Sequence, residues 1–307
     1  MWSASEYDYD RVSAYYFNVD VRVLPFNFDK DDGFSLRCLQ DCFGGKTYTA
    51  DQFCLNDVVK EKCNGETYAD GKFCFDNKLY DKCGGEEYNP STQFCRMDKE
   101  VVDYNYLIDD RDGQTYKTVT IGTQTWMAEN LNYEYNKGSA KSYCINDNAD
   151  SCAKYGRLYT WSAAMDSAAQ FAENAGTKCG YAAKCTPNTP HRGICPEGWH
   201  VPTEAEYTTL YTYIGGTSTA STYLKSTSGW KDSCNGTNNY GFSVLPAGFC
   251  YDGIFYDVGY GASLWSASEN GPISAYGQDF YHSYAGVDQN SYSKYYGYSL
   301  RCLQDSN

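Results

Sequence analysis

The chain has 307 residues and a formal net charge of −14, from 25 Lys and Arg against 39 Asp and Glu. This acidity disfavours nucleic acid or an anionic membrane surface as the main partner. The 15 cysteines, with only 3 histidines and as many as 32 tyrosines, favour disulfides in an exported β-rich protein over zinc sites or a cytosolic enzyme.

The first segment, residues 1–41, repeats the end of the chain. It begins on "WSASE" and closes on "GFSLRCLQD", while residues 265–305 begin on the same letters and close on "GYSLRCLQD". We interpret residues 1–41 as the truncated C-terminal remnant of a first domain of the kind that ends the chain.

Cys38 holds the place in this remnant that Cys302 holds in the final repeat. No cysteine precedes Cys38, so we expect it to be unpaired and Met1 to be a truncated or misassigned start within a tandem domain. Such a start also explains why the first residues do not resemble a signal peptide. The alternative is that residues 1–41 pack as extra strands on a neighbour or a second chain, with a disulfide at Cys38.

Residues 42–103 contain three copies of a unit with a period of about twenty residues. Each copy reads Cys, a Gly-containing turn, Tyr, turn-forming residues and Phe-Cys. This predicts hairpins whose strands flank "TADQ", "ADGK" and "NPSTQ". A disulfide in each would contribute roughly 3 kcal/mol through the entropy of the unfolded chain. The predicted pairs are Cys42–Cys54, Cys63–Cys74 and Cys83–Cys95. The segment is either a flexible linker without a ligand or a repeat that binds carbohydrate or protein.

Residues 104–111 are predicted to be an acidic linker, followed by a large domain over residues 112–305. At its start, "GQTYKTVTIGTQTWMAENLNYE" alternates apolar and polar residues on both sides of "GTQ". This alternation predicts two strands joined by a tight turn.

Two helices are predicted next, and short strands and turns fill the rest of the domain. The helical spacing of Leu158, Trp161 and Met165 predicts a helix that stops near Gly176. "VPTEAEYTTLYTYIGG" predicts a second helix, in which Thr203 and the Glu three residues later form a capping box.

Six motifs in the large domain resemble one known family. They are "DGQTYKTVTIGTQTWMAENLNY", "CAKYGRLYTW", "CPEGWHVPTEAEY", "YGFSVLPAGF", "LWSASE" and "YSLRCLQD". In this order they are similar to the Fibrobacter succinogenes major paralogous domain family, over residues 112–305. The Cys-Gly-Gly repeats also look like segments that accompany such domains. The resemblance implies a secreted or surface-attached bacterial protein of largely unassigned function.

The order of elements is similar to the C-type lectin-like fold. The fold class expected is therefore α+β, a C-type lectin-like domain of two helices and curled antiparallel strands preceded by small disulfide-stapled β-hairpin repeats. "WHVPTEAEY" also resembles a segment of formylglycine-generating sulfatase-modifying enzymes, which use a related fold. Fold similarity does not transmit function, so each site is judged on its own residues.

Neither a metal site nor a catalytic centre is predicted. The Glu-Pro-Asn or Gln-Pro-Asp and Trp-Asn-Asp triplets of calcium-dependent lectins are absent. The turns at 29–33 and 146–150 lack the ligand spacing of an EF-hand, and we interpret them as solvated acidic turns. His191, His200 and His282 lie in separate motifs, and no motif supplies a nucleophile and a base together. We expect no cofactor and no enzymatic activity.

The other cysteines of the large domain bracket short loops, except for one long-range pair. The predicted disulfides are Cys144–Cys152, Cys179–Cys185, Cys234–Cys250 and Cys195–Cys302. The last pair would tie the end of the domain to its helical half, although many other pairings are open from sequence alone.

Aromatic and polar residues alternate between the second predicted helix and the final strands. Flat rings beside amides and carboxylates suit a sugar, because the ring covers C–H groups while the polar groups bind hydroxyls. The candidate ligand-binding residues are Trp230, Asp232, Asn235, Asn238, Tyr240, Tyr251, Asp252, Tyr256 and Tyr260. We expect a non-catalytic binding module, secreted or on the cell surface, for polysaccharide or another surface component. The alternatives are a purely structural surface protein and, with less support, an enzyme of the formylglycine-generating fold.

Overall fold

The computed structural model describes residues 2–6, 11–17, 23–29, 51–55, 58–171 and 179–306. The chain forms two compact units, Met1–Asp81 and Lys82–Asn307. Cys38, the turn after Asp29 and the predicted Cys42–Cys54 pair lie outside the residues whose side chains are described.

The first unit begins with three antiparallel strands, β1 (Trp2–Glu6), β2 (Arg11–Phe17) and β3 (Val23–Asp29), in that order in the sheet. Near the chain end, β18 (Gly261–Glu269), β19 (Ser274–Tyr281) and β20 (Asp288–Ser293) have the same order. "WSASE" begins β1 and recurs within β18. The repeated sequence therefore forms the same three-stranded unit in both places.

Two hairpins complete this unit, and their pairing differs from the prediction. Their strands are β4 (Gln52–Leu55) with β5 (Val58–Glu61) and β6 (Lys72–Phe75) with β7 (Lys78–Asp81). In both, the Phe-Cys strand pairs with the residues that follow it, and in the second hairpin it does not pair with those before "ADGK". In the β6–β7 hairpin, Asp76 and Asn77 both adopt positive φ, which a two-residue turn matched to the strand twist requires. The Cys63–Cys74 disulfide fastens the preceding loop to β6.

The third hairpin, β8 (Gln93–Cys95) and β9 (Val101–Asp103), belongs to the larger unit, and the Cys83–Cys95 disulfide fastens the preceding loop to β8. Phe94 and Tyr104 are buried in a core cluster of this unit. The predicted linker at 104–111 is wrong, because β10 (Asn105–Asp109) pairs along its whole length with β11 (Gln114–Ile121). Its backbone extends the edge of a sheet, while Asp109 is buried and Tyr106 and Ile108 are exposed.

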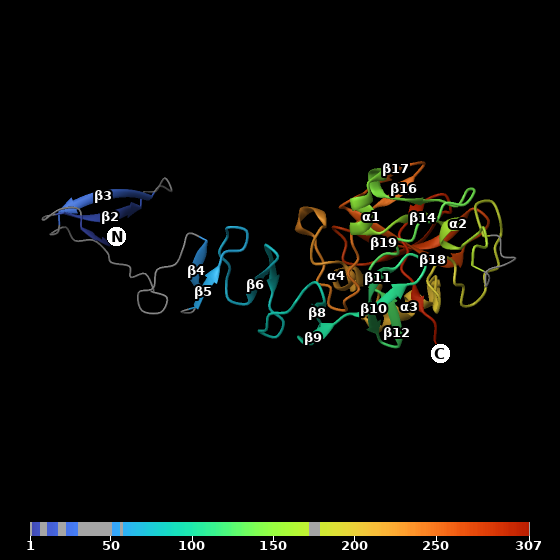
Figure 1. The fold of residues 1–307 in the computed structure, drawn as a ribbon, viewed down its shortest axis with the longest axis horizontal. Helices are drawn as coiled ribbons and strands as arrows, with labels where there is room; N and C mark the ends of the chain where they lie inside the picture. The colour runs from blue at the N-terminus through green and yellow to red at the C-terminus, as the bar shows by residue number, and fades with distance from the viewer. Residues whose placement is uncertain are drawn as a thin grey trace. The chain divides into compact units, whose positions relative to one another are not determined.

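Besides the β8–β9 hairpin, the described residues of the larger unit form three antiparallel sheets (Figure 1). One has the order β10-β11-β12-β22-β15, and "GTQ" joins β11 to β12 as predicted. Another has the order β13-β14-β21-β16-β17, and the third is β18-β19-β20. The remaining strands are β12 (Gln124–Met127), β13 (Ser142–Tyr143), β14 (Leu158–Thr160), β15 (Trp199–His200), β16 (Phe249–Tyr251), β17 (Ile254–Tyr256), β21 (Gly297–Tyr298) and β22 (Leu303–Gln304).

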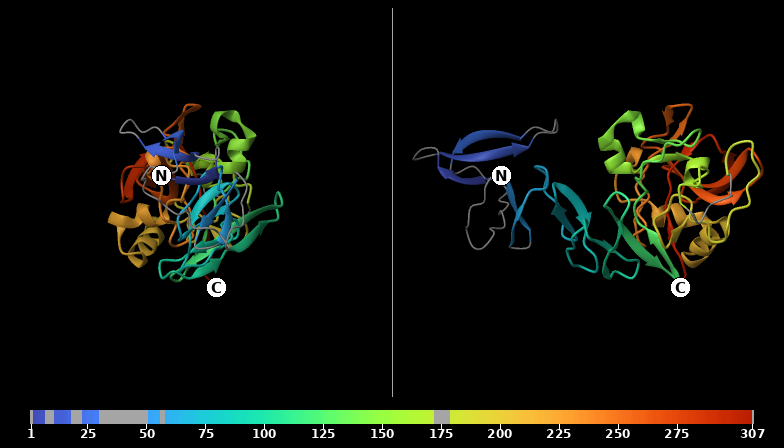
Figure 2. Two further views of the ribbon diagram at one scale, coloured as in Figure 1. Left: turned by 90° about the vertical axis from the view of Figure 1, so that its left-hand side faces the viewer. Right: turned by 45° about the vertical axis from the view of Figure 1, so that its right-hand side comes forward.

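The predicted second helix is confirmed as α3 (Glu204–Tyr213), whose first turn has the Thr203–Glu206 capping box. The short helix α4 (Thr217–Leu224), which was not predicted, follows at once. Figure 2 shows α3 and α4 next to each other on one side of the unit. Tyr211 of α3 donates a hydrogen bond from its hydroxyl to Gln278 of β19 at 3.0 Å, so the helix packs on the third sheet.

The predicted first helix is wrong in extent. Residues 158–160 form β14, and among the described residues of this segment, 158–171, the α-helical ones are Trp161–Ala164, as α2. Thr160 ends the strand and caps the helix, and Asp166 then adopts a positive φ that stops it. The spacing was misread because α2 is buried on every side. The described residues also form α1 (Ala149–Tyr155) and the 3-10 turns η1 (Ile145–Asp147) and η3 (Lys231–Ser233).

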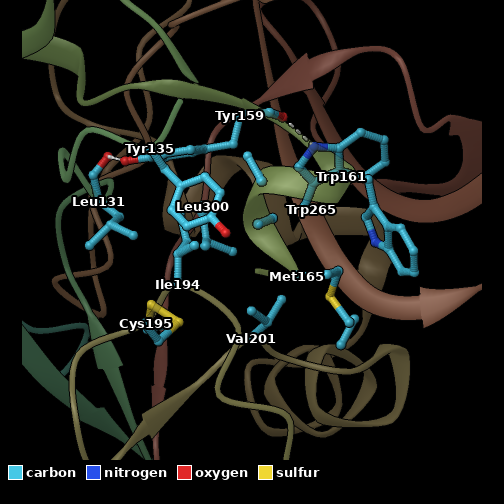
Figure 3. Close-up of a cluster of buried hydrophobic side chains, with 14 of the residues drawn as sticks. Leu131, Tyr135, Tyr159, Trp161, Met165, Ile194, Cys195, Val201, Trp265 and Leu300 are labelled. Carbon is cyan, nitrogen blue, oxygen red and sulfur yellow. Dashed lines mark hydrogen bonds between the residues drawn. A yellow bond between two sulfur atoms is a disulfide. The ribbon is translucent and has the colours of Figure 1, made fainter. Parts of the chain in front are cut away.

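A large apolar core holds the sheets together (Figure 3). The Trp265 indole donates to the Tyr159 carbonyl at 2.7 Å, and the Trp161 indole donates to the Ser266 carbonyl at 2.9 Å. The predicted Cys195–Cys302 disulfide is present at the edge of this cluster. The described part of the chain is thus mostly β, with few helices, curled antiparallel sheets and several disulfides.

Candidate ligand-binding site

Trp230 does not face a ligand. Its side chain is 4% exposed and lies in the core cluster that also contains Phe242. The indole donates to the Ser226 hydroxyl at 3.1 Å and to the Val244 carbonyl at 3.2 Å. The prediction that Trp230 binds a ligand is therefore wrong, and Trp230 is a core residue. Its ring is buried among apolar groups, and its N–H group has two hydrogen-bond acceptors.

Asn235, Asn238 and Tyr240 hold the long loop in place. The Asn235 side chain accepts from the Trp230 backbone N–H at 3.1 Å. Asn238 accepts from the Ser243 backbone N–H at 2.7 Å and its amide contacts the Tyr104 hydroxyl at 3.1 Å. The Tyr240 hydroxyl lies 3.8 Å from the Met97 sulfur. Asn235 therefore fastens the loop to itself, while Asn238 and Tyr240 contact Tyr104 and the turn of the third hairpin.

Tyr251, Asp252 and Tyr256 lie on the β16–β17 hairpin and are exposed. The Tyr256 ring stacks on Phe249 at 5.2 Å, and the Tyr251 ring meets Tyr296 edge-on at 5.2 Å. Their rings therefore present aromatic surface at one end of the second sheet.

Tyr260 lines a surface hollow of about 690 Å³, which we call the tyrosine hollow, and Asp232 lies beside one of its lining residues, His282. The Tyr260 ring meets the His282 ring edge-on at 5.2 Å, and Asp232 lies 3.6 Å from the same imidazole. The hollow is lined by Asp257, Tyr260, Tyr281, His282, Ser283, Tyr284 and Asp288. Of these, the rings of Tyr260, Tyr281 and Tyr284 are 40–46% exposed, so they are accessible to a ligand.

A more enclosed cavity of about 300 Å³ adjoins the hollow and shares Asp257 and Tyr281 with it. Its walls come from the second and third sheets, which face each other here. It is lined by Gly248, Phe249, Asp257, Gly261, Ala262, Ser263, Asp279, Phe280, Tyr281, Tyr292, Tyr296 and Tyr298. We call this the Asp279 cavity.

The strand register determines which carboxylates of this region lie next to one another. Ser263 of β18 pairs with Asp279 of β19, and Asp279 pairs with Asp288 of β20. Directly opposite residues of antiparallel strands share a face, so these three side chains form one row. The row leads from the Asp279 cavity towards the tyrosine hollow.

Asp279 is 3% exposed, and neither carboxylate oxygen has a hydrogen-bond partner among the described residues. Burial raises the pKa of Asp279 to about 6, which the nearby Ser263 and Tyr292 hydroxyls only partly oppose. A buried carboxylate without a partner is costly for a fold. Such a group in a cavity is a candidate functional residue.

Lys225, which sequence reasoning missed, holds the wall of the hollow in place. Its buried ammonium donates to the carbonyls of Cys234, Tyr281 and His282 at 3.0, 3.2 and 3.0 Å. Burial lowers the pKa of Lys225. An isolated Lys after a helix gives no local signal of this role, because its partners lie on a distant strand end and a loop.

The predicted Cys234–Cys250 disulfide is absent, and both residues are free thiols. Cys250 of β16 packs in a small apolar cluster with Ile145 and Leu158, and burial raises the pKa of its thiol. Cys234 instead ends η3, where Lys225 holds its carbonyl. The predicted Cys144–Cys152 and Cys179–Cys185 disulfides are present.

The histidines do not converge in the structure. His191 contacts the Met165 carbonyl at 3.0 Å through its Nε2 atom. His200 lies between Glu206 at 2.9 Å and Asp305 at 2.6 Å, which joins α3 to the end of the chain. Within the described residues, no group of three or more His, Cys, Asp or Glu side chains could hold a metal ion. The turn at 146–150 supplies the cap of α1, since Asn148 accepts from the Asp150 backbone N–H.

No curated protein and no solved structure matches the chain. The sequence profile of one family, the Fibrobacter succinogenes major domain, matches residues 119–304. This match contains the Asp279 cavity, the tyrosine hollow and the core around Trp265. The chain therefore belongs to the Fibrobacter succinogenes major domain family.

Proposed function

We propose that the protein is a non-catalytic binding module, secreted or on the cell surface, that recognises polysaccharide through the tyrosine hollow. The observation that carries this proposal is the grouping of three accessible rings, Tyr260, Tyr281 and Tyr284, around the carboxylates of Asp257 and Asp288. Rings of this kind cover the C–H faces of a sugar, and carboxylates accept hydrogen bonds from its hydroxyls.

The residues that support this proposal differ from most of those expected from the sequence. Tyr260 and Asp232 are retained, because both lie at the hollow. Tyr251 and Tyr256 provide a second aromatic surface on the β16–β17 hairpin. A C-type lectin-like arrangement, with the ligand held by the long loop region, agrees with this location and belongs to the same proposal.

Export is supported by the disulfides, which persist in oxidising compartments. In the part of the chain that the structure describes, no helix is long and apolar enough to cross a membrane.

The proposal is tested by binding of the oxidised full chain to an array of plant-wall and bacterial polysaccharides. Tyr281→Ala and Tyr284→Ala are expected to weaken binding about tenfold or more each, as for buried aromatic contacts at an interface. Tyr106→Ala is the matched control, since this tyrosine is 52% exposed on β10, away from the hollow. Absence of binding to every polysaccharide would favour the purely structural surface protein.

A further inference from the structure

We propose that the Asp279 cavity binds an organic ammonium group, and that the polysaccharide recognised at the hollow carries free amino groups. This inference rests on the proposed function and names its ligand class. Asp279 lines the cavity and is buried, and its oxygens have no partner at normal hydrogen-bond geometry among the described residues. The hydroxyls of Ser263 and Tyr292 lie near the carboxylate, but they are neutral and do not balance its charge. A group with these properties is complemented by a cationic hydrogen-bond donor that arrives from outside.

The protein itself supplies no cation at this place. No Lys, Arg or His is among the residues that line the Asp279 cavity. The nearest described carboxylates, Asp257 and Asp288, add negative charge and disfavour ionisation of Asp279. The buried lysines of this unit are used elsewhere, Lys225 by three carbonyls and Lys294 by Glu269 and the carbonyls of Gly180 and Ala183.

Aromatic walls favour an organic ammonium over a metal ion. Phe249, Tyr281, Tyr292, Tyr296 and Tyr298 line the cavity, and ring faces attract a cation placed over them. Calcium instead takes about six to eight oxygen ligands, several of them carboxylates. The described residues contain no such group of acidic side chains.

Gly277 shows how the rings are brought to the carboxylate. It lies two residues before Asp279 on β19, on the same face of the strand. A Cβ atom here would lie 3.2 Å from the Tyr298 ring and 3.3 Å from the Tyr292 ring. The absence of a side chain lets both rings approach the strand beside Asp279.

The adjacency of the two cavities links the ammonium to a sugar chain. Asp257 and Tyr281 line both, so a sugar ring on Tyr281 can direct a substituent into the Asp279 cavity. The Asp279 cavity, of about 300 Å³, can hold a substituent or a single sugar residue. The open tyrosine hollow, of about 690 Å³, can hold the neighbouring part of the sugar chain. An amino sugar presents both features, a C–H face and an ammonium group.

The experiment measures binding of the oxidised full chain to three soluble probes close to neutral pH. These are oligomers of glucosamine, of N-acetylglucosamine and of glucose, of equal length. Wild type is expected to bind the glucosamine oligomer at least about tenfold more tightly than the other two. Asp279→Asn, which keeps the shape of the side chain, is expected to remove this preference while leaving binding to the neutral oligomers unchanged.

The outcomes separate this inference from the proposed function. Equal binding of all three oligomers, or an unchanged preference in Asp279→Asn, overturns the ammonium site and keeps the polysaccharide module. Binding of none of them contradicts both. A calcium-dependent rise in melting temperature that Asp279→Asn abolishes would show a metal site and also overturns the inference. The melting temperature of Asp279→Asn without ligand verifies that the variant is folded.

Discussion

Cys195, just before α3, is joined to Cys302 near the end of the chain by a disulfide that spans 107 residues. The two Cα atoms lie 5.9 Å apart, and both side chains are fully buried. This bond fixes the last segment of the chain, which contains β22, against the segment that leads into the predicted and confirmed helix.

Replacing Cys195 and Cys302 together by Ser should lower the free energy of unfolding by about 5 kcal/mol, because a long loop loses most entropy when closed in the unfolded chain. The same double replacement at Cys144 and Cys152, which closes a separation of 8, should cost only about 2 to 3 kcal/mol. Chemical denaturation of both variants measures the difference. Equal losses would contradict an entropic role for the long loop.

Arg301 is expected to be a structural residue of the "SLRC" motif. It is fully buried, donates to Asn130 and the Ser243 carbonyl at 2.9 Å each, and lies 4.6 Å from the Phe242 ring centre. Arg301→Met should lower the free energy of unfolding by about 3 kcal/mol, since it leaves buried acceptors without donors.

The control for this variant is Arg96→Met. Arg96 is exposed and pairs with the exposed carboxylates of Asp98 and Glu100, so its replacement should change the free energy of unfolding very little. Denaturation curves of the two variants under one set of conditions provide the comparison, and similar losses would show that the burial of Arg301 contributes nothing.

Asp279 should make stability fall as pH rises. Its pKa is raised from 3.8 to about 6 in the folded chain, so the folded state holds a proton that the unfolded state has lost between these values. The free energy of unfolding should therefore decrease by up to about 3 kcal/mol as pH rises from below 4 to above 6.

Asp279→Asn removes this titration. The variant should match wild type at low pH and exceed it in melting temperature at neutral pH. Thermal unfolding at a series of pH values measures both curves. If the difference in melting temperature between wild type and Asp279→Asn does not change with pH, then Asp279 is not buried in its charged form.

Phe94 should anchor the third hairpin to the larger unit. It is 5% exposed and packs at 5.1 Å from Tyr104, and the Gly241 position leaves room for its ring. Phe94→Ala should lower the free energy of unfolding of this unit by about 3 to 5 kcal/mol. Phe73→Ala, the matching change in the second hairpin, belongs to the other unit and should leave this transition unchanged.

The sequence was sufficient to predict those elements whose structure depends on residues close together along the chain. The capping box at Thr203 and the turn between β11 and β12 depend on residues a few positions apart, and both were predicted. The Phe-Cys strand of each hairpin was recognised, but the strand that follows it and pairs with it was not. The reason is that the two-residue turn at Asp76 and Asn77 competed with a more conspicuous Gly-containing turn before it.

The candidate site could be predicted only in part, because its residues meet through long-range packing. An aromatic residue in a loop rich in Asn and Asp looks the same whether it is buried, as Trp230 is, or exposed, as Tyr260 is. Asp279 was overlooked because its burial depends on the register of β18, β19 and β20 and on the second sheet that covers them. No sequence pattern within β19 itself indicates that Asp279 is buried.

Lys225 has a consequence for how tightly any ligand can be held. Its ammonium binds the carbonyls of Tyr281 and His282 on one side and of Cys234 on the other, so the wall of the hollow is already fixed before a ligand arrives. A loop that must become ordered on binding loses conformational entropy, which weakens the complex. Here that loss has already occurred during folding, so a ligand that binds at this wall does not have to compensate for it.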